Sequence, residues 1–414
     1  MRILFVHQNF PGQFRHLAPA LVERGHEVTA FSIQPDASAQ WHGVRVIRYA
    51  PRRHSTPDIH PWLADFETKT IRGEAAFRAA LQLKEGGYAP DVIVAHPGWG
   101  ESLFLKDVWA DAKLGLYCEL HYRDRGADLD FDPEFPADEA TAACQMRLRN
   151  INNLLHFECS EAGVSPTRWQ AASFPQPFRE RITVIHDGVD TQALVPNSGV
   201  EITFNGDLVL NRRSEVVTYV SRTLEPYRGY HVFMRALPRL LRERPNARVL
   251  IVGGETGGYG KPAPQGSTWR EIFLTEATRQ MPAEDRARVF FLGALPYASF
   301  IAVLQLSTVH VYLTYPFVLS WSLLEAMSVG CAIVGSDTPP VQEVLRDGVN
   351  ARLVPFFDSH ALASAVAGLL ADREARQRIG AQARADVVAA YDLRSVCLPA
   401  QIAWVEALGR STCA

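Results

Sequence analysis

The sequence is poor in the features that mark membrane, disulfide-rich and nucleic-acid-binding proteins. No stretch approaches the roughly 20 consecutive apolar residues that a membrane-spanning helix needs. Its 414 residues include six cysteines, with no C-x-x-C pair and no ligand-like spacing to histidines, so we expect reduced thiols. Basic and acidic residues nearly balance, 42 against 45, which argues against a general nucleic-acid binder.

The first ten residues, MRILFVHQNF, lead directly into a short apolar run without a small-residue cleavage site. We interpret them as a first β-strand and not as a signal peptide. Together with the cysteine usage, this predicts a cytoplasmic protein that makes at most peripheral contact with the inner membrane face.

What is present is typical of a soluble, folded protein of more than one domain. The hydrophobic fraction of 47% and the charged fraction of 21% are ordinary globular values. A chain of 414 residues is too long for one hydrophobic core, because single cores stop growing well below that size. We therefore expect two domains.

The first half alternates apolar runs with helical patterns, which predicts an α/β domain with a mainly parallel sheet covered on both faces. The expected strands are residues 2–6, 28–33, 44–49, 91–96 and 114–120. The expected helices are residues 14–25, 66–83 and 102–110.

The second half repeats this alternation after residues 196–215, which we interpret as a loop. The predicted architecture is two Rossmann-like, doubly wound domains, 1–194 and 195–394, that face each other across a cleft. The C-terminal helix, 395–414, is expected to pack back on the first domain. Ligands of such sheets bind at the carboxyl ends of the strands.

The segment 319–354, LSWSLLEAMSVGCAIVGSDTPPVQEVLRDGVNARLV, contains a candidate anion site. Ser320 and Ser322 can cap a helix, and the free backbone N–H groups of a helix start attract anions. Glu325, one turn further, is placed to accept hydrogen bonds from a sugar or ribose hydroxyl pair. An ordinary capped helix with a surface glutamate explains the same pattern.

The segment SRTLEPYRGYHVFMRALP contains two candidate phosphate ligands. Arg222 ends a predicted strand, and Arg228 precedes Gly229 at a helix start. Guanidinium groups bind phosphate oxygens in a forked geometry, which suits a diphosphate. A pair of solvated arginines is the alternative.

Two further clusters carry less weight. Asp128, Asp130 and Asp132 lie in an acidic loop that could hold a divalent cation, but such runs are usually solvated, and we expect no metal site. The basic stretch 45–54 could meet lipid headgroups or an acidic acceptor, or form a solvated rim.

Four segments, in this order and at these separations, resemble the family 4 glycosyltransferases, which have the two-domain GT-B fold. The segments are HQNFPGQFRHLAPALVERGHEV, VIHDGVDT, SRTLEPYRG and LLEAMSVGCAIVGSDTPPVQEVLRDGVNARLV, and the resemblance covers nearly the whole chain. It implies metal-independent transfer of a sugar from a nucleotide diphosphate sugar with retention of configuration, as in bacterial glycan or glycoconjugate synthesis. No cofactor is implied beyond this co-substrate.

The resemblance also implies roles for individual residues. The donor would bind the C-terminal domain, with Arg222 and Arg228 on its diphosphate, although lysine is usual at the position of Arg228. Glu325 matches the glutamate that holds the ribose hydroxyls. The amides of Ser322, Leu323 and Leu324 match those that face the phosphates, and Leu292, Gly293 and Leu295 fall where backbone groups meet the base.

In the N-terminal domain, which would bind the acceptor, His121 resembles the family histidine beside the donor sugar. Gly12, with Pro11 and Gln13, matches a glycine-bearing loop that approaches the donor phosphates. Most relatives have two glycines there and this chain has one. The acceptor class stays open between a glycan, a lipid-linked sugar and a small molecule, and no nucleic-acid partner is implied.

One departure is clear. The family places a sugar-contacting glutamate eight residues before Glu325, where this chain has Phe317. This departure keeps a non-catalytic binding protein on the GT-B scaffold open. A nucleotide-sugar 2-epimerase, which shares this two-domain design, stays open as well. The glycine-rich segment 253–269 is expected to be a mobile loop beside the donor that orders on binding.

Overall fold

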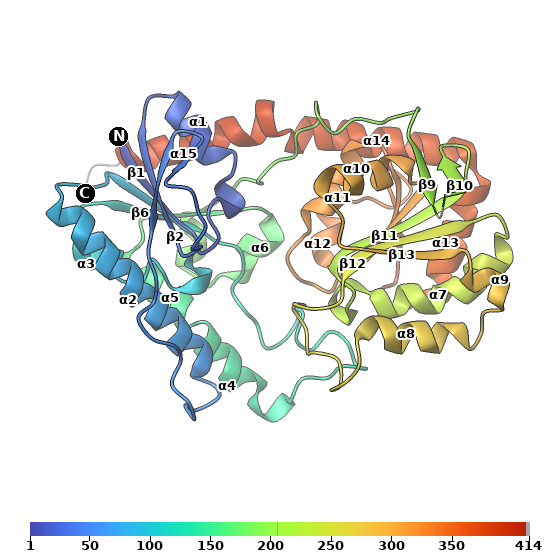
Figure 1. Cartoon of the computed structure of the whole chain (residues 1–414), viewed down its shortest axis with the longest axis horizontal. Coiled ribbons are helices and arrows are strands. Elements are labelled where there is room, and N and C mark those ends of the chain that lie inside the picture. Colours follow the sequence, from blue (N-terminus) through green and yellow to red (C-terminus); the bar gives the residue numbers. More distant parts are fainter. Residues whose placement is uncertain (205, 411–414) are drawn as a thin grey trace. The chain divides into compact units, whose positions relative to one another are not determined.

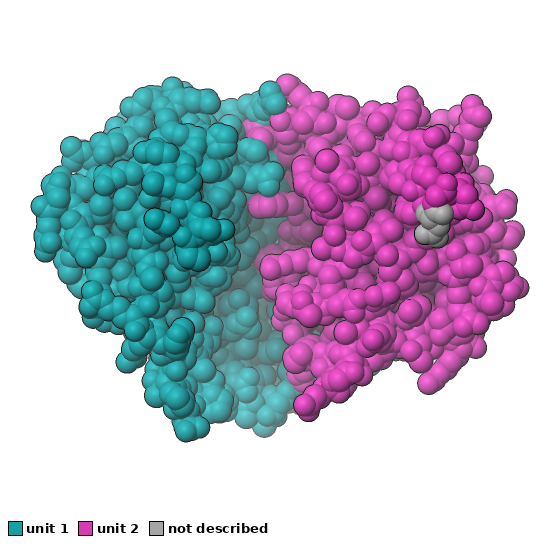
Figure 2. Space-filling view, viewed as in Figure 1, with its two compact units in different colours: residues 1–188, 394–414 teal, residues 189–393 magenta. Residues whose placement is uncertain are grey.

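The computed structural model describes residues 1–204 and 206–410, and the chain divides into two compact units (Figure 2). Unit 1 comprises residues 1–188 and 394–414, and unit 2 comprises residues 189–393. The predicted boundary after residue 194 thus lies inside unit 2. The reason is that Val189 and Leu194 are buried in the core of unit 2, where the Val189 amide donates to the Tyr391 carbonyl.

Unit 1 is built on an eight-stranded sheet of order β3-β4-β2-β1-β5-β6-β7-β8, which is parallel except for the pairing of β3 with β4. Its strands are β1 (Arg2–Val6), β2 (Glu27–Ser32), β3 (Gln40–Trp41), β4 (Val44–Arg48), β5 (Val92–Ala95), β6 (Lys113–Tyr117), β7 (Ala162–Ser165) and β8 (Ile182–Val184). Its helices are α1 (Leu17–Glu23), α2 (Ala64–Glu85), α3 (Leu105–Val108), α4 (Glu139–Arg149), α5 (Ile151–Cys159), α6 (Arg168–Ser173) and α15 (Leu398–Arg410).

Helices cover both faces of this sheet, as the alternation along β1 requires. Ile3 and Phe5 point toward the face that α1 and α15 cover, whereas Leu4 and Val6 join the core beneath α2, α3 and α5. A Cβ atom on Gly115 would lie 2.6 Å from the Trp404 ring, so α15 packs close against β6. The last four residues of the predicted C-terminal helix, 411–414, lie outside the described residues.

Unit 2 has a six-stranded, fully parallel sheet of order β13-β12-β11-β14-β15-β16 and a separate antiparallel hairpin, β9-β10. Its strands are β9 (Glu201–Phe204), β10 (Leu208–Asn211), β11 (Val216–Thr223), β12 (Arg248–Gly254), β13 (Val289–Gly293), β14 (Val309–Tyr312), β15 (Ala332–Ser336) and β16 (Arg352–Val354). Its helices are α7 (Tyr230–Glu243), α8 (Trp269–Thr278), α9 (Ala283–Arg286), α10 (Tyr297–Leu306), α11 (Trp321–Ser328), α12 (Pro339–Gln342), α13 (Ser359–Ala371) and α14 (Arg373–Tyr391).

Two helix layers enclose the sheet of unit 2. In Figure 1, α7 and α8 lie below the sheet, and α10, α11 and α14 lie above it. The upper layer buries Leu323, Met327 and Val387 in one apolar cluster with the strand residue Ile333. Loops and helix termini therefore lie along the two edges of the sheet that the strand ends form, one at the amino ends and one at the carboxyl ends of the strands.

The loop expected at 196–215 is wrong in part, because it contains the hairpin β9-β10. Ile202 and Phe204, which Thr203 separates, pair across the hairpin with Leu210 and Leu208, and these apolar side chains pack with Val303 of α10. The many polar and glycine residues of the segment hide this period-2 pattern. The helix expected at 102–110 is also shorter than predicted, since only Leu105–Val108 is helical.

Within residues 1–204 and 206–410, no helix combines the length and apolar character that crossing a membrane requires.

Candidate active site

The carboxyl edge of the sheet of unit 2, called the donor edge below, carries the candidate phosphate ligands. Arg222 is the penultimate residue of β11, and its side chain is exposed. Among the residues that the structure describes, this side chain makes no hydrogen bond or ion pair. It is therefore a free cation at the place where a parallel sheet binds ligands.

Arg228 differs from Arg222 because it is buried, with 7% of its surface exposed. It ends a short 3-10 helix, Pro226–Arg228, and Gly229 follows at φ +69° to begin α7. The Arg228 Nη1 donates to Thr314 Oγ1 at 2.8 Å and to the Val318 carbonyl at 3.0 Å. Both partners are uncharged, so the positive charge of Arg228 is held in place without being neutralised by them.

Phe317 is part of an aromatic cluster around this guanidinium. Its ring is 6% exposed and lies 5.0 Å from the Tyr259 ring and 5.5 Å from the Tyr227 ring, centroid to centroid. The Arg228 guanidinium carbon lies 5.6 Å from the Phe317 ring centroid and 5.4 Å from that of Tyr259. Phe317 thus packs within the protein and contributes a cation–π contact to Arg228.

The glycine-rich segment is attached to the same place by Glu225, a buried residue that the sequence analysis missed. The two carboxylate oxygens of Glu225 accept hydrogen bonds from the Tyr259 and Gly260 amides, each at 3.0 Å. A Cβ on Gly258 would lie 2.3 Å from one of these oxygens, which requires glycine at that position. The segment therefore lies beside Arg228, while its place beside a bound donor and its ordering on donor binding stay predictions.

The start of α11 forms the third part of the donor edge. Ser320 is the N-cap of α11, and its hydroxyl accepts a long 3.4 Å hydrogen bond from the Ser322 amide. The Leu323 amide donates to the Ser320 carbonyl at 3.2 Å, and Leu324 is buried in the core. An anion at these amides would compete with the weak contact to the Ser320 hydroxyl.

Glu325 lies one turn into α11 and is half-buried. The Tyr297 hydroxyl at the start of α10 donates to Glu325 Oε1 at 2.8 Å, so the carboxylate is oriented toward the neighbouring helix. The segment 292–295 precedes α10, and β13 ends in it at Gly293. The side chains of Leu292 and Leu295 pack on the hairpin core. Their positions suit recognition through backbone groups.

In unit 1, Gly12 and Gln13 lie against His7, a residue that the sequence analysis did not single out. Gly12 has φ +46°, and a Cβ there would approach the His7 ring to 2.4 Å, so only glycine fits. The Asn9 amide donates to His7 Nδ1, which makes Nε2 the protonated nitrogen that donates to Gln13 Oε1 at 2.6 Å. Burial, and then the charge of His96, lowers the pKa of His7 to about 3.

Glu119 completes this polar cluster. The Gln13 Nε2 donates to Glu119 Oε1 at 3.4 Å, and His96 Nε2 lies 3.5 Å from Glu119 Oε2. Burial by itself would raise the pKa of Glu119, but its interactions with His96, His7 and Gln13 lower the pKa below its usual value. Glu119 therefore stays a carboxylate among imidazoles at neutral pH.

His121 lies four residues after β6 and is half-buried against aromatic rings. Its ring is stacked on Phe157 at 6.3 Å and lies 5.9 Å from Phe174, and its amide donates to Ser173 Oγ. Burial lowers the pKa of His121 to about 4, and the charge of Arg123 adds to this effect. The imidazole is therefore neutral near pH 7 and suits hydrogen bonding better than proton donation.

Two carboxylates of the acidic loop accept hydrogen bonds from backbone amides of the same loop. The Asp130 carboxylate accepts from the Gly126 amide at 3.2 Å, and that of Asp132 accepts from the Glu134 amide at 2.9 Å. Asp128 and Asp132 are buried, contrary to the solvated surface that we expected from the run of acids.

Two family models match the chain in succession. The model described as "Glycosyl transferase family 4 group" matches residues 24–194, and "Glycosyl transferases group 1" matches residues 203–386. The chain belongs to the family 4 glycosyltransferases. It is a transferase enzyme, and this assignment removes the epimerase and the non-catalytic protein as leading alternatives.

The relatives agree with this family. A D-inositol 3-phosphate glycosyltransferase of Corynebacterium glutamicum is 25% identical over 297 residues, which span 69% of this chain and 64% of that protein. Sucrose-phosphate synthase from Thermosynechococcus elongatus has a TM-score of 0.74 at 18% identity, covering 99% and 100% of the two chains. HepE from Anabaena, solved with UDP and glucose, has a TM-score of 0.66 at 18% identity, covering 99% of this chain and all of HepE. The GT-B fold expected from the sequence is confirmed.

The polar residues of the candidate site that the sequence analysis missed share one signal. His7, His96 and Glu119 follow β1, β5 and β6, which are neighbours in the sheet, and Glu225 follows β11. Each is a polar residue within two positions of the carboxyl end of a parallel strand. A systematic search at those positions would have found them.

Proposed function

We propose that this glycosyltransferase moves a sugar from a nucleoside diphosphate sugar to an acceptor hydroxyl, without a metal ion and with retention of the anomeric configuration. The observation that carries the proposal is the convergence of three positive groups at the donor edge. These are the exposed Arg222, the buried Arg228 and the amide end of α11. HepE, which shares the fold, was solved with UDP and glucose, and this supports a nucleotide-sugar donor.

The three groups suit a leaving diphosphate. As the bond between the anomeric carbon and the phosphate oxygen breaks, negative charge grows on that oxygen. Arg222 and Arg228 stabilise this charge by electrostatic interactions that are in place before the reaction, which is the role that a divalent cation has in other transferases. The two neutral hydrogen bonds of Arg228 fix its guanidinium and leave its charge available.

The acceptor oxygen would attack the anomeric carbon on the face that the diphosphate leaves. Its proton would pass to a leaving phosphate oxygen, so that nucleoside diphosphate and the glycosylated acceptor are the products. Glu325 would hold the ribose hydroxyls, and backbone groups of 292–295 would meet the base. In unit 1, Gly12 and Gln13 would approach the donor phosphates, and a neutral His121 would hydrogen-bond to the donor sugar.

The acceptor class follows only from relatives. One of them is named for D-inositol 3-phosphate. Among a glycan, a lipid-linked sugar and a small molecule, we therefore favour a phosphorylated small molecule. We place the reaction in the cytoplasm, because the six cysteines lack the spacing of a disulfide framework.

The test is incubation of the full chain with UDP-, GDP- and ADP-sugars in the presence of EDTA, with and without a panel of polyol phosphates. Acceptor-dependent release of one nucleoside diphosphate, together with a glycoside of retained configuration, supports the proposal. Activity that EDTA abolishes would contradict metal independence. An isomeric nucleotide sugar as the main product would identify an epimerase, and saturable binding without turnover would identify a binding protein.

A further inference from the structure

Unit 2 contains a second basic site, at the edge of the sheet where the strands begin. It is a cavity of about 780 Å³ with nine lining residues. Four of them are arginines, Arg212, Arg213, Arg373 and Arg376, and we call this site the basic pocket. None of the nine is acidic. Its volume lies within the range of about 300 to 1,000 Å³ that is typical of small-molecule sites.

The basic pocket is separate from the donor edge. Arg212 and Arg213 precede β11, while Thr308 and Ala332 lie at the starts of β14 and β15. Arg222 lies near the opposite end of β11, a strand of eight residues. At about 3.3 Å per residue, the two edges are roughly 25 Å apart. A diphosphate bound at Arg222 therefore does not occupy the basic pocket.

Two of the four guanidinium groups are already fixed in place. The Arg212 Nη1 donates to the carbonyls of Gln305 and Ser307 at 2.9 and 2.7 Å. The Arg376 Nη1 donates to the carbonyls of Leu369 and Leu370 at 2.6 and 2.5 Å. The Nε and Nη2 groups of both have no partner among the described residues. Each arginine thus offers a rigid pair of donors, which lowers the entropic cost of binding a ligand.

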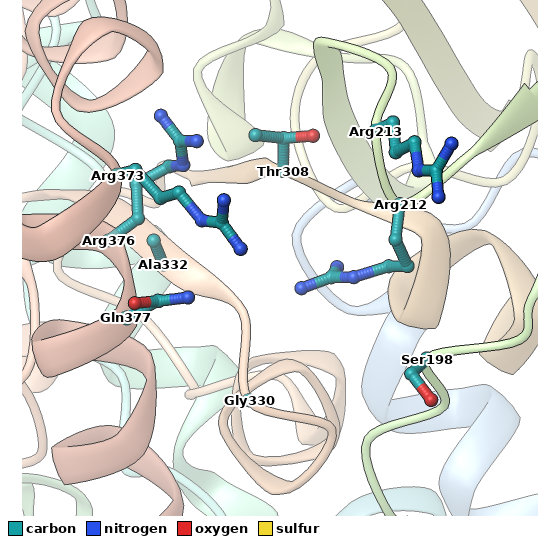
Figure 3. Close-up of a pocket in the computed structure, with 9 residues that line it drawn as sticks. All are labelled: Ser198, Arg212, Arg213, Thr308, Gly330, Ala332, Arg373, Arg376 and Gln377. Atoms are coloured by element: carbon teal, nitrogen blue, oxygen red, sulfur yellow. The ribbon is translucent and has the colours of Figure 1, made fainter.

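The other two arginines have no such role. The side chains of Arg213 and Arg373 form no hydrogen bond or ion pair with any residue that the structure describes. Arg373 and Arg376 extend into the pocket from one side and Arg212 from the other (Figure 3). Burial lowers the pKa of Arg376, and the charges of Arg244 and Arg373 lower it further, against an opposing effect of Glu215. The pocket therefore concentrates like charges that repel one another and that an anion would stabilise.

We propose that the basic pocket binds a phosphorylated sugar. Phosphate oxygens match the forked geometry of guanidinium groups, and several arginines suit a dianionic phosphomonoester. The Ser198 hydroxyl and the Gln377 amide supply neutral groups for sugar hydroxyls. The lining has no aromatic ring on which a base could stack, which favours a sugar phosphate over a nucleotide. This site is independent of the proposed donor chemistry.

The experiment is calorimetric titration of the full chain with glucose 6-phosphate, with glucose as the uncharged control. The informative variant is Arg213→Ala combined with Arg373→Ala, since neither side chain forms a hydrogen bond or ion pair within residues 1–204 and 206–410. The matched control is Arg242→Ala, which removes an exposed arginine of α7 that makes no side-chain contact with described residues and lies outside the pocket.

The wild type and Arg242→Ala should bind glucose 6-phosphate with one site, and neither should bind glucose. The double variant should bind at least about tenfold more weakly, a loss of about 1.4 kcal/mol, while its affinity for UDP stays unchanged. Unchanged glucose 6-phosphate binding in the double variant would overturn the proposal, because the probe would then occupy another site. An equal loss in Arg242→Ala, or no saturation up to about 10 mM, would also overturn it.

A lipid headgroup also carries a phosphate group that the four arginines would bind. Co-sedimentation of the wild type with phosphatidic acid vesicles, lost in the double variant and not competed by glucose 6-phosphate, would assign the four arginines to a membrane surface. That result would overturn the proposal of a soluble ligand. The same titrations with inorganic phosphate, which should bind more weakly than glucose 6-phosphate, test the contribution of the sugar.

Discussion

Arg222 and Arg228 would both stabilise the leaving diphosphate, but the structure predicts that their removal affects stability very differently. Arg222 is exposed and makes no side-chain contact with described residues, so Arg222→Ala should change the free energy of unfolding by no more than about 0.5 kcal/mol. Its effect on turnover should be large. Removing one preorganised donor to a developing anion typically lowers kcat by about 10² to 10³.

Arg228→Ala should lower turnover to a similar degree and also destabilise the chain. It removes two hydrogen bonds from a charged donor, to Thr314 Oγ1 and the Val318 carbonyl, and such bonds contribute about 1.5 to 3 kcal/mol each. Its contacts with the Phe317 and Tyr259 rings are lost as well. We expect a loss of about 3 kcal/mol or more, which for a unit of this size lowers Tm by roughly 6 to 12 °C.

The assay pairs nucleoside diphosphate release under saturating donor with thermal unfolding of the same preparations. Arg242→Ala, which changes an exposed arginine far along α7, is the control that should alter neither quantity. Turnover of Arg222→Ala within about threefold of wild type would refute the donor-edge assignment, since the expected loss is far larger. An unchanged Tm for Arg228→Ala would refute the contact network described for that residue.

Three further outcomes are expected. Burial lowers the pKa of His156 to about 4, so the unfolded chain takes up the proton first as the pH falls, and the native chain loses stability. His156→Gln should therefore reduce the loss of unfolding free energy between pH 7.5 and 5.5 by about 1.4 kcal/mol. An equal loss in the wild type and in His156→Gln, measured by thermal unfolding, would contradict this. Phe317→Glu should lower turnover with every donor instead of changing donor preference, because the new carboxylate would lie beside Arg228 and neutralise its positive charge. A switched donor profile would show that this position reaches the sugar. Saturating glucose 6-phosphate should change the affinity for UDP by at least about twofold in the wild type and not in Arg213→Ala/Arg373→Ala, because α10 and α11 connect the two basic sites. By linkage, UDP should then change the affinity for glucose 6-phosphate by the same factor. Identical UDP titrations with and without glucose 6-phosphate would exclude coupling.

The alternation of strands and helices was predictable because buried parallel strands read as continuous apolar runs. Residues 2–6, for example, form a strand with the predicted bounds. The hairpin β9-β10 was not predictable in the same way. Its inward-facing residues, Ile202 and Leu210 among them, lie at every second position and are buried only when α10 packs on them. Burial of that kind is a tertiary effect, which a local pattern does not contain.

The candidate site was predictable in part for the same reason. Arg222 lies at a strand end, and this position could be read from the local sequence. The burial of Arg228 and its cation–π contacts depend on Phe317 and Tyr259, which come from two distant segments. Likewise, His7 and Glu119 are single polar residues after strands, and only the order of β1, β5 and β6 in the sheet brings them together through Gln13.

Helices α10 and α11 link the two basic sites of unit 2 physically. Both begin at the donor edge, where Tyr297 donates to Glu325, and both end at the opposite edge of the sheet. There the carbonyls of Gln305 and Ser307, which close α10, are held by Arg212, and Gly330, just after α11, lines the basic pocket. A phosphate bound to the Nε and Nη2 groups of Arg212 would hold this guanidinium, and with it the carbonyl end of α10, more firmly in place. Tyr297 lies at the other end of α10, so the carboxylate proposed to hold the ribose would be held more firmly as well.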